Sequence, residues 1–296
     1  MINSKPWHSI FTQIDKKEFS ARPLSWIYCT QEYVFKITRY SDSIEDDIFN
    51  PKSIKYSKKE YEQLLLLNQL DASVIKPLDL IDACMVMPYI KGHDLVNESA
   101  KIRVQDNLVD FSAYIEEGIA LCARLHRYES VIFADIPEYN YQKHEFLPAS
   151  EPRLIQAIKN HRKTISIQGF EIRNFRYDQL SGKLVFFDPH HVYLGLPEED
   201  FTRYILSLLM INWGRNINFL IWQKFDYTKL VKVYETTRGA KLDKLMLDYT
   251  FSLNLAMRKA HAKTSILEMN GFKKLIAYIY FQLFFLQVDW WRKNMV

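Results

Sequence analysis

The sequence predicts an α+β protein in which a small antiparallel-sheet lobe with one helix precedes a larger, mainly helical lobe. Within the first 90 residues, short β-branched and aromatic runs surround a single leucine-rich helical segment. From "PEEDFTRYILSLLMINW" onward, apolar residues recur at helical spacing, and glycine and proline are rare. The character of the chain changes near Gly92. Residues 1–91 are therefore expected to form the small lobe and residues 92–296 the large lobe.

The small lobe is expected to contain several strands around its helix. Runs of β-branched and aromatic residues predict strands at 7–14, 25–30, 32–40, 74–82 and 83–90. "SKKEYEQLLLLNQL" predicts a helix that starts at Ser57, because Ser57 and Glu60 have the spacing of a capping box ahead of a leucine face. The polar segment between the third strand and this helix is expected to be a connection.

The large lobe is expected to begin with a long amphipathic helix at 105–128. A hairpin-like insertion is predicted at 165–195, and helices follow it to the end of the chain. These patterns contain no internal repeat and no low-complexity stretch.

Composition narrows the class of protein. The chain has 296 residues, 48% of them hydrophobic and 25% charged, which is enough apolar material for one large domain or two modest ones. Its three cysteines form no CxxC pair, which is typical of buried thiols in a reducing compartment. The N-terminus lacks the pattern of a signal peptide, so a cytoplasmic location is expected. Basic residues are dispersed and no nucleic-acid-binding module is recognisable, so nucleic acid is not an expected partner.

Lys36 lies within "YVFKI", a predicted strand with apolar neighbours. Burying a lysine is costly unless its ammonium meets an anion, although a lysine in an edge strand can also extend its charge to solvent. The helix that follows offers Glu60 and Glu62. Because Glu60 already has a role at the capping-box position, Glu62 is the expected partner of Lys36.

The segments "YVFKI", "YEQLLLLNQL" and "VIKPLDLIDACMVMPYIKGHDL" together resemble the small lobe of the protein-kinase-like superfamily, particularly its aminoglycoside and sugar phosphotransferase branches. The resemblance implies a bilobal kinase-like fold whose small lobe binds the nucleotide, with Lys36 and Glu62 holding the phosphates of ATP. It also implies roles for the residues of "VMPYIKGHDL": Met87 would flank the adenine pocket, the Pro88 carbonyl and the Ile90 amide would meet the adenine edge, and Asp94 would bond the ribose.

A second pair of segments, "GFEIRNFRYD" and "KLVFFDPHHV", resembles the catalytic loop and the metal-binding strand of lipopolysaccharide-core sugar kinases. By that resemblance Asn174 and Asp188 would be ligands of magnesium (Mg2+), a hard cation that prefers oxygen. Asp200 would be the buried aspartate that braces the catalytic loop, although an acidic residue at a helix N-terminus is also favoured by the helix dipole. His126 is expected to be a packed structural histidine.

Two departures from the family pattern concern catalysis. The segment "DKKEFSARPLS" occupies the place of a glycine-rich phosphate loop and contains no glycine. Gly169 stands where an aspartate would accept the proton of the substrate hydroxyl. Glu171, three residues before Asn174, is a speculative substitute for that base, and a solvent-facing loop residue is the alternative.

These observations lead to three functional hypotheses. The first is an ATP- and magnesium-dependent phosphotransferase acting on a sugar hydroxyl of a cell-envelope glycolipid such as lipopolysaccharide core. The second is a catalytically impaired pseudokinase that acts as a binding or scaffolding module. The third is an unrelated α+β enzyme with an unrecognised site, which the absence of a Lys36–Glu62 pair would favour.

The C-terminal segment "GFKKLIAYIYFQLFFLQVDWWRKNMV" is dense in aromatic and aliphatic residues between basic ends. Phe272–Trp291 is predicted to be helical. Such a helix either packs on the large lobe or lies at lipid head groups, where tryptophans and basic residues are common. The second alternative predicts peripheral contact with the inner face of the cytoplasmic membrane, with Lys273, Lys274 and Arg292 beside the exposed aromatic residues.

Overall fold

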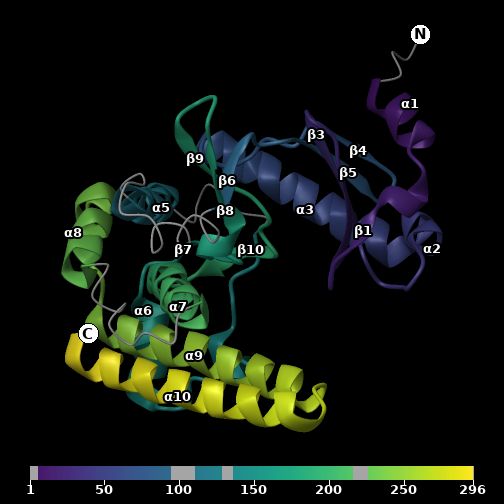
Figure 1. Cartoon of the computed structure of the whole chain (residues 1–296). Coiled ribbons are helices and arrows are strands. Elements are labelled where there is room, and N and C mark those ends of the chain that lie inside the picture. Colours follow the sequence, from purple (N-terminus) through teal and green to yellow (C-terminus); the bar gives the residue numbers. More distant parts are fainter. Residues whose placement is uncertain (1–5, 95–110, 129–135, 216–225, 296) are drawn as a thin grey trace. The chain divides into compact units, whose positions relative to one another are not determined.

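The computed structural model describes residues 6–94, 111–128, 136–215 and 226–295. Contacts divide the chain into two compact units (Figure 1). The first unit comprises Met1–Asp94 and Asn174–His191, and the second comprises Leu95–Arg173 and Val192–Val296. This division differs from a single boundary after residue 91, because the segment 174–191 belongs with the first unit. Residues 176–178 of this segment pair with strand β6 (Gly92–Asp94) of the first unit.

The first unit contains a five-stranded antiparallel sheet in the order β1-β2-β3-β5-β4. The helix α3 (Pro51–Leu70) lies against β3, β4 and β5. The strands have these bounds: β1 Ser20–Ala21, β2 Ser25–Cys29, β3 Tyr33–Thr38, β4 Asp79–Ile81 and β5 Cys84–Pro88. The predicted strands at 25–30, 32–40, 74–82 and 83–90 are therefore found, with shorter bounds.

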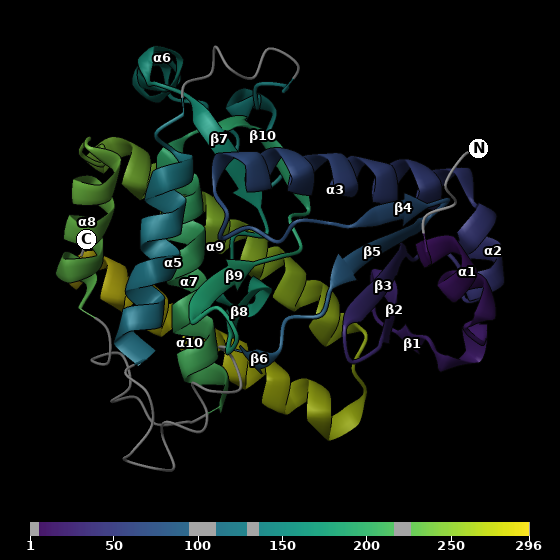
Figure 2. The ribbon, with the colours of Figure 1, turned by 90° about the horizontal axis from the view of Figure 1, so that it is seen from above.

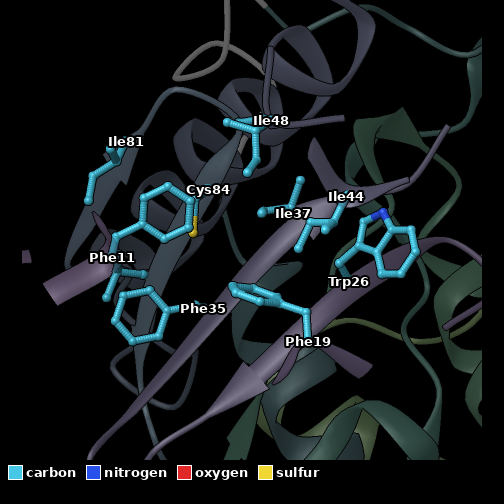
Figure 3. Close-up of a cluster of buried hydrophobic side chains, with 11 residues drawn as sticks. Phe11, Phe19, Trp26, Phe35, Ile37, Ile44, Ile48, Ile81 and Cys84 are labelled. Carbon is cyan, nitrogen blue, oxygen red and sulfur yellow. The ribbon is translucent and has the colours of Figure 1, made fainter. Parts of the chain in front are cut away.

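The segment predicted as a strand at 7–14 is instead the helix α1 (Pro6–Gln13). The apolar residues of this segment are Trp7, Ile10, Phe11 and Ile14, which is the spacing of one helical face and not of a strand. That face packs into the apolar core of the first unit, where Phe11 stacks near Phe35 (Figure 3). The aromatic content of the segment suggested a strand, but the spacing of its apolar residues favours a helix.

The predicted connection at 41–56 is also helical. It contains α2 (Ile44–Phe49) and the beginning of α3. Asn50 caps α3 by accepting a hydrogen bond from the Lys52 amide, and Pro51 occupies the first helical position, where its missing N–H costs nothing. The capping box predicted at Ser57 is therefore wrong, because Ser57 lies inside the helix and its hydroxyl contacts Thr38 of β3.

A second, three-stranded sheet of the first unit has the order β6-β8-β9. Strands β8 (Phe175–Asp178) and β9 (Lys183–Phe186) form a hairpin, and β8 pairs antiparallel with β6. Gly92 of β6 is required at this pairing, because a Cβ atom there would lie 1.6 Å from the Tyr177 carbonyl oxygen.

The second unit is mainly helical. Helix α5 (Phe111–Leu125) contacts α8 (Tyr227–Arg238), and α7 (Pro197–Arg215) contacts α9 (Lys244–Leu267). A small sheet joins β7 (Thr164–Gln168) to β10 (His191–Gly195), so the segment predicted as one insertion contributes to two separate sheets. Helix α6 (Pro152–Asn160) precedes β7. The predicted helix at 105–128 is found from residue 111, and its first part lies outside the described residues.

The last helix, α10 (Gly271–Met295), runs beside α9 (Figure 1 and Figure 2). Its helical structure confirms the prediction for Phe272–Trp291. Phe284, Val288 and Trp291 are buried, so one face of α10 packs on the unit. Within the described part of the chain, no helix is both long and apolar enough to cross a membrane.

Asp47 connects α2 to the sheet of the first unit. Its carboxylate is fully buried and accepts hydrogen bonds from the Trp26 indole at 2.8 Å and from the amides of Tyr40 and Ser41 at 3.0 and 3.1 Å. Burial alone would raise the pKa of Asp47, but these hydrogen bonds outweigh burial and lower it. Asp47 therefore stabilises the fold while it is ionised.

Replacing Asp47 by Asn is expected to lower the free energy of unfolding by about 2 kcal/mol, because the new amide presents donors to groups that already donate. A carboxyl with a lowered pKa stabilises the fold above its ordinary pKa of about 4, and this contribution is lost as the pH falls through the lowered value. Denaturant unfolding should show a difference between wild type and D47N that narrows below about pH 4. The control Asp42→Asn, at a fully exposed side chain, should change stability by less than about 0.5 kcal/mol. A difference independent of pH would contradict this role of the carboxylate.

Candidate active site

Lys36 is the centre of the candidate site in the first unit. It lies in the middle of β3, paired with Ile27 on one side and Met85 on the other. Its side chain is only 12% exposed, and its ammonium contacts two carboxylates. The Nζ atom lies 2.6 Å from Glu60 Oε1 and also forms an ion pair with Asp188. A buried ammonium between two carboxylates can hold an anion such as a phosphate group when one of them turns away.

The partner on α3 is Glu60, so the expectation of a Lys36–Glu62 pair is wrong. The face of α3 toward the sheet carries residues 53, 57, 64 and 67, and Glu60 falls in this series whereas Glu62 does not. Glu62 is 62% exposed and lies 3.9 Å from Lys58. The error came from the misplaced helix start, which gave Glu60 a capping role that it does not have.

The charges around Lys36 shift the pKa values of Lys36 and of Glu60. Burial alone would lower the pKa of Lys36, but the Glu60 and Asp188 carboxylates outweigh burial and raise it. Burial and the nearby Asp188 raise the pKa of Glu60 to about 6, against the opposing effect of Lys36. Lys36 is therefore a cation at neutral pH.

Asn174 and Asp188 lie together, although fourteen positions separate them in the chain. The Asn174 amide nitrogen donates to the Asp188 carbonyl at 3.3 Å, and the Phe187 amide donates to the Asn174 carbonyl at 2.9 Å. Asp188 has a φ of 66°, a left-handed conformation that is uncommon outside glycine and clusters at functional sites. One carboxylate and one amide are hard oxygen donors, so the pair fits Mg2+ with phosphate and water completing its coordination.

A pocket of about 180 Å³ adjoins Lys36 and Asp188. Its walls include the three residues predicted to contact the base, Met87, Pro88 and Ile90. The Tyr89 amide donates to the Glu32 carbonyl, so by strand alternation the Pro88 carbonyl and the Ile90 amide point away from β3. Strand β4 pairs with β5 only as far as Val86, so the backbone of β5 beyond Val86 has no pairing with β4. The side chain of Asp94, the predicted ribose contact, lies outside the described residues.

Arg176 also lines this pocket and was not expected from the sequence. Its Nη2 atom donates to the Gly92 carbonyl at 3.1 Å, and its guanidinium lies 5.4 Å from the centre of the Tyr89 ring. The Nε–H group is buried and has no hydrogen-bond partner among the described residues. A buried unpaired donor on a pocket wall favours a ligand with an acceptor at that position.

The segment in place of a phosphate loop comprises a short 3-10 helix (Lys16–Glu18), β1 and the turn that leads into β2. The Arg22 amide donates to the Ser25 carbonyl, which closes the turn without glycine. Lys16, one of the basic residues of this segment, donates to the carbonyls of Phe11 and Ile14. Its ammonium is therefore occupied by the protein's own backbone.

The loop that carries Gly169 and Glu171 belongs to the second unit. Gly169 has a φ of 112°, a conformation that L side chains rarely adopt. Glu171 is 8% exposed, so the solvent-facing alternative is wrong. Its carboxylate lies 2.9 Å from Arg173 and also pairs with Arg258 of α9. Both carboxylate oxygens of the speculative base are thus held by guanidinium groups.

Asp200 supports the strand that leads into this loop. Its two carboxylate oxygens accept from the Ile167 amide at 3.0 and 2.8 Å, and Arg203 donates to both Asp200 and the Ile167 carbonyl. Burial raises the pKa of Asp200, while hydrogen bonds from His126 and Arg203 oppose that rise. His126 is buried between Asp200 and Tyr234, as expected for a structural histidine. These contacts favour the bracing role over a helix-dipole role.

Comparison with known proteins concerns the fold. A family model described as RIO domain, a protein-kinase-like family, matches residues 27–147, a range that includes Lys36 and Glu60 and ends before Asn174. No curated protein matches the chain in sequence.

Three solved structures are similar over most of their length. The aminoglycoside phosphotransferase APH(3'')-Id from Streptomyces rimosus, in complex with ADP and streptomycin, is 13% identical, with a TM-score of 0.53 over 86% of this chain and 98% of that one. A choline/ethanolamine kinase family protein from Mesorhizobium loti is 12% identical, with a TM-score of 0.51 over 92% and 86%. The GDP complex of aminoglycoside 2'-phosphotransferase-IIIa is 10% identical, with a TM-score of 0.52 over 94% and 96%.

At these identities the likeness concerns the fold and not the reaction. The chain therefore has the α+β, bilobal protein-kinase-like fold that is shared with aminoglycoside phosphotransferases and choline kinases.

Proposed function

We propose that the chain binds ATP with Mg2+ and transfers the terminal phosphate to a sugar hydroxyl. The observation that carries the proposal is the buried contact of Lys36 with Glu60 and Asp188 beside the pocket lined by Met87 and Ile90. Each of these groups has a separate task in phosphotransferases of this fold: anchoring phosphate, orienting the lysine and holding metal.

The acceptor in this proposal is the sugar of a cell-envelope glycolipid such as lipopolysaccharide core. Two features support a sugar acceptor: the resemblance of the 169–192 segment to lipopolysaccharide-core sugar kinases, and the aminoglycoside phosphotransferases among the similar folds. A glycolipid acceptor would bring the protein to a membrane surface, peripherally and at the inner face of the cytoplasmic membrane. The C-terminal helix α10 is the proposed point of contact.

In the proposed reaction, Lys36 binds the phosphate oxygens while Glu60 fixes the direction of its side chain. Asn174 and Asp188 would hold Mg2+, which supplies charge neutralisation on the phosphates when bound. The acceptor oxygen would form a bond to the terminal phosphorus and lose its proton to solvent, the bond to the leaving oxygen would break, and the nucleoside diphosphate would depart. Such transfer relies mainly on positioning and charge, so a weak proton acceptor slows it without preventing it.

A pseudokinase that binds nucleotide without transfer is the second candidate function, and the loop of the second unit favours it. Gly169 offers no proton acceptor, and Glu171 is held by Arg173 and Arg258. An assay of labelled phosphate transfer from ATP to lipopolysaccharide-core oligosaccharide, with and without Mg2+, distinguishes the two functions. Nucleotide binding without any transfer would identify a pseudokinase that binds nucleotide, and the absence of nucleotide binding would leave a scaffold that keeps the kinase-like fold.

Replacing Lys36 by Met is expected to weaken the binding of Mg-ATP by about tenfold or more, because a charge-assisted hydrogen bond to phosphate is lost. The matched control is Lys58→Met on the exposed face of α3, which should leave the affinity within about twofold. Calorimetric titration measures both variants. Glu62→Gln should also bind normally, and a loss of binding in that variant with normal binding in K36M would contradict the assigned site.

Replacing Arg176 by Leu is expected to change the base preference of the pocket. An arginine offers only donors, and guanine presents two adjacent acceptors where adenine pairs one acceptor with a donor. R176L should therefore lose about tenfold in GTP affinity while keeping that for ATP. Competition titrations with both nucleotides test this. Equal losses for both nucleotides would mean that Arg176 does not contact the base.

Restoring an aspartate at position 169 is not expected to raise the rate of transfer. The φ of 112° lies outside the region that aspartate tolerates, so Gly169→Asp should destabilise the protein by about 1–3 kcal/mol. Gly182→Asp is the matched control: φ there is 66°, a left-handed conformation that aspartate adopts more readily. Thermal unfolding and phosphate transfer are measured for both. A faster and stable G169D protein would show that the loop keeps ordinary kinase geometry.

A further inference from the structure

A groove of about 570 Å³ runs between α9 and α10 in the second unit, and none of its lining residues is one assigned to nucleotide binding or catalysis. Apolar side chains from both helices line it, including Ile266, Phe281 and Leu286. Three lysines also line it: Lys259, Lys263 and Lys274. The groove thus combines an apolar wall with cations, which is the chemistry of a site for an anionic amphiphile.

The outer face of α10 next to this groove is exposed and apolar. The exposed fractions of its large apolar residues range from 44% at Leu283 to 75% at Phe272. The large apolar residues of this outer face recur at intervals of four and three: Phe272, Ile276, Ile279, Leu283, Leu286 and Trp290. Soluble proteins rarely leave so continuous an apolar strip uncovered, so the strip marks an interaction surface.

The charges around the groove identify the kind of partner. Lys259 lies 3.4 Å from Asp289, the carboxylate that also lines the groove. No carboxylate of the described residues lies within ion-pair distance of Lys263 or Lys274, and Lys273 and Lys293 add exposed cations at the two ends of the strip. Tryptophan and tyrosine side chains such as Trp290 and Tyr278 are exposed along it, which is typical of surfaces at lipid head groups.

We infer that the α9–α10 groove and the outer face of α10 dock on a bilayer surface that contains anionic phospholipid. The strip enters the head-group region, one acyl chain occupies the groove, and the lipid phosphate lies at Lys263 and Lys274. The inference is independent of phosphoryl transfer, because it uses no residue of the nucleotide pocket. It supplies a specific site for the peripheral membrane contact that a glycolipid acceptor requires.

A second copy of the chain is the competing occupant, because intervals of four and three also suit a partner helix. Charge favours lipid over self-association. A second copy would bring the same lysines to the groove, and its only carboxylate there, Asp289, is already next to Lys259. Like charges placed together oppose docking, whereas phosphate head groups neutralise them.

The test is flotation of the full chain with vesicles of phosphatidylcholine alone or mixed equally with phosphatidylglycerol. The wild-type chain is expected to float with the anionic vesicles, and less so as salt increases. Ile279→Glu with Leu286→Glu should lower the partition coefficient at least about tenfold, since two apolar contacts are lost. Both side chains are exposed, at 50% and 65%, so the folded state should persist by circular dichroism.

Two further variants separate charge from apolar contact. Lys263→Gln with Lys274→Gln should lower binding to anionic vesicles about tenfold and leave the weak binding to neutral vesicles unchanged. Leu180→Glu, at a side chain 78% exposed in the first unit, is the control and should float as the wild type does. Absence of flotation overturns the inference, as does flotation indifferent to the strip variants. So does a dimer in light scattering that the Ile279 and Leu286 substitutions dissociate.

Discussion

The ammonium of Lys36 is a charge that the first unit buries in the middle of its sheet, and three elements are arranged to neutralise it. The third strand carries it, α3 brings Glu60 to 2.6 Å, and the segment after β9 brings Asp188. An isolated ammonium at this depth would be too costly to retain, so α3 and the segment after β9 each have to bring a carboxylate to it. The pocket lies directly beside it.

That constraint explains which parts of the site could be predicted from the sequence. A lysine amid apolar strand residues signals a buried charge, and an asparagine and an aspartate fourteen positions apart signal a pair of oxygen donors. The partner on the helix was assigned wrongly because the helix starts at Pro51 and not at Ser57, which changes the residue that faces the sheet. The series Ser53, Ser57, Glu60, Leu64 was visible in the sequence and contained the correct answer.

Other features depend on contacts between distant segments, which local patterns do not carry. Arg176 acquires its place on the pocket wall only when β8 pairs with β6, and Arg258 reaches Glu171 only when α9 packs in the second unit. The helix α1 is a different case. Its apolar spacing is that of a helix, whereas its aromatic content is typical of a strand. The α10 helix follows from a strong local pattern, whereas the sheet order, the place of the 174–191 segment in the first unit and the charges of the pocket follow from tertiary structure.

The loop around Gly169 and the exposed surface of α10 both relate to the proposed phosphoryl transfer. The loop is not a kinase loop with one group missing: its backbone takes a glycine conformation, and its carboxylate is committed to two arginines. A site with little help for proton transfer depends more on holding its two substrates together for a long time. In the proposed function, attachment to the surface that carries the acceptor would raise the local concentration of the second substrate and keep the site occupied. The exposed apolar strip and its lysines would then favour occupancy of a site whose loop offers little help for proton transfer.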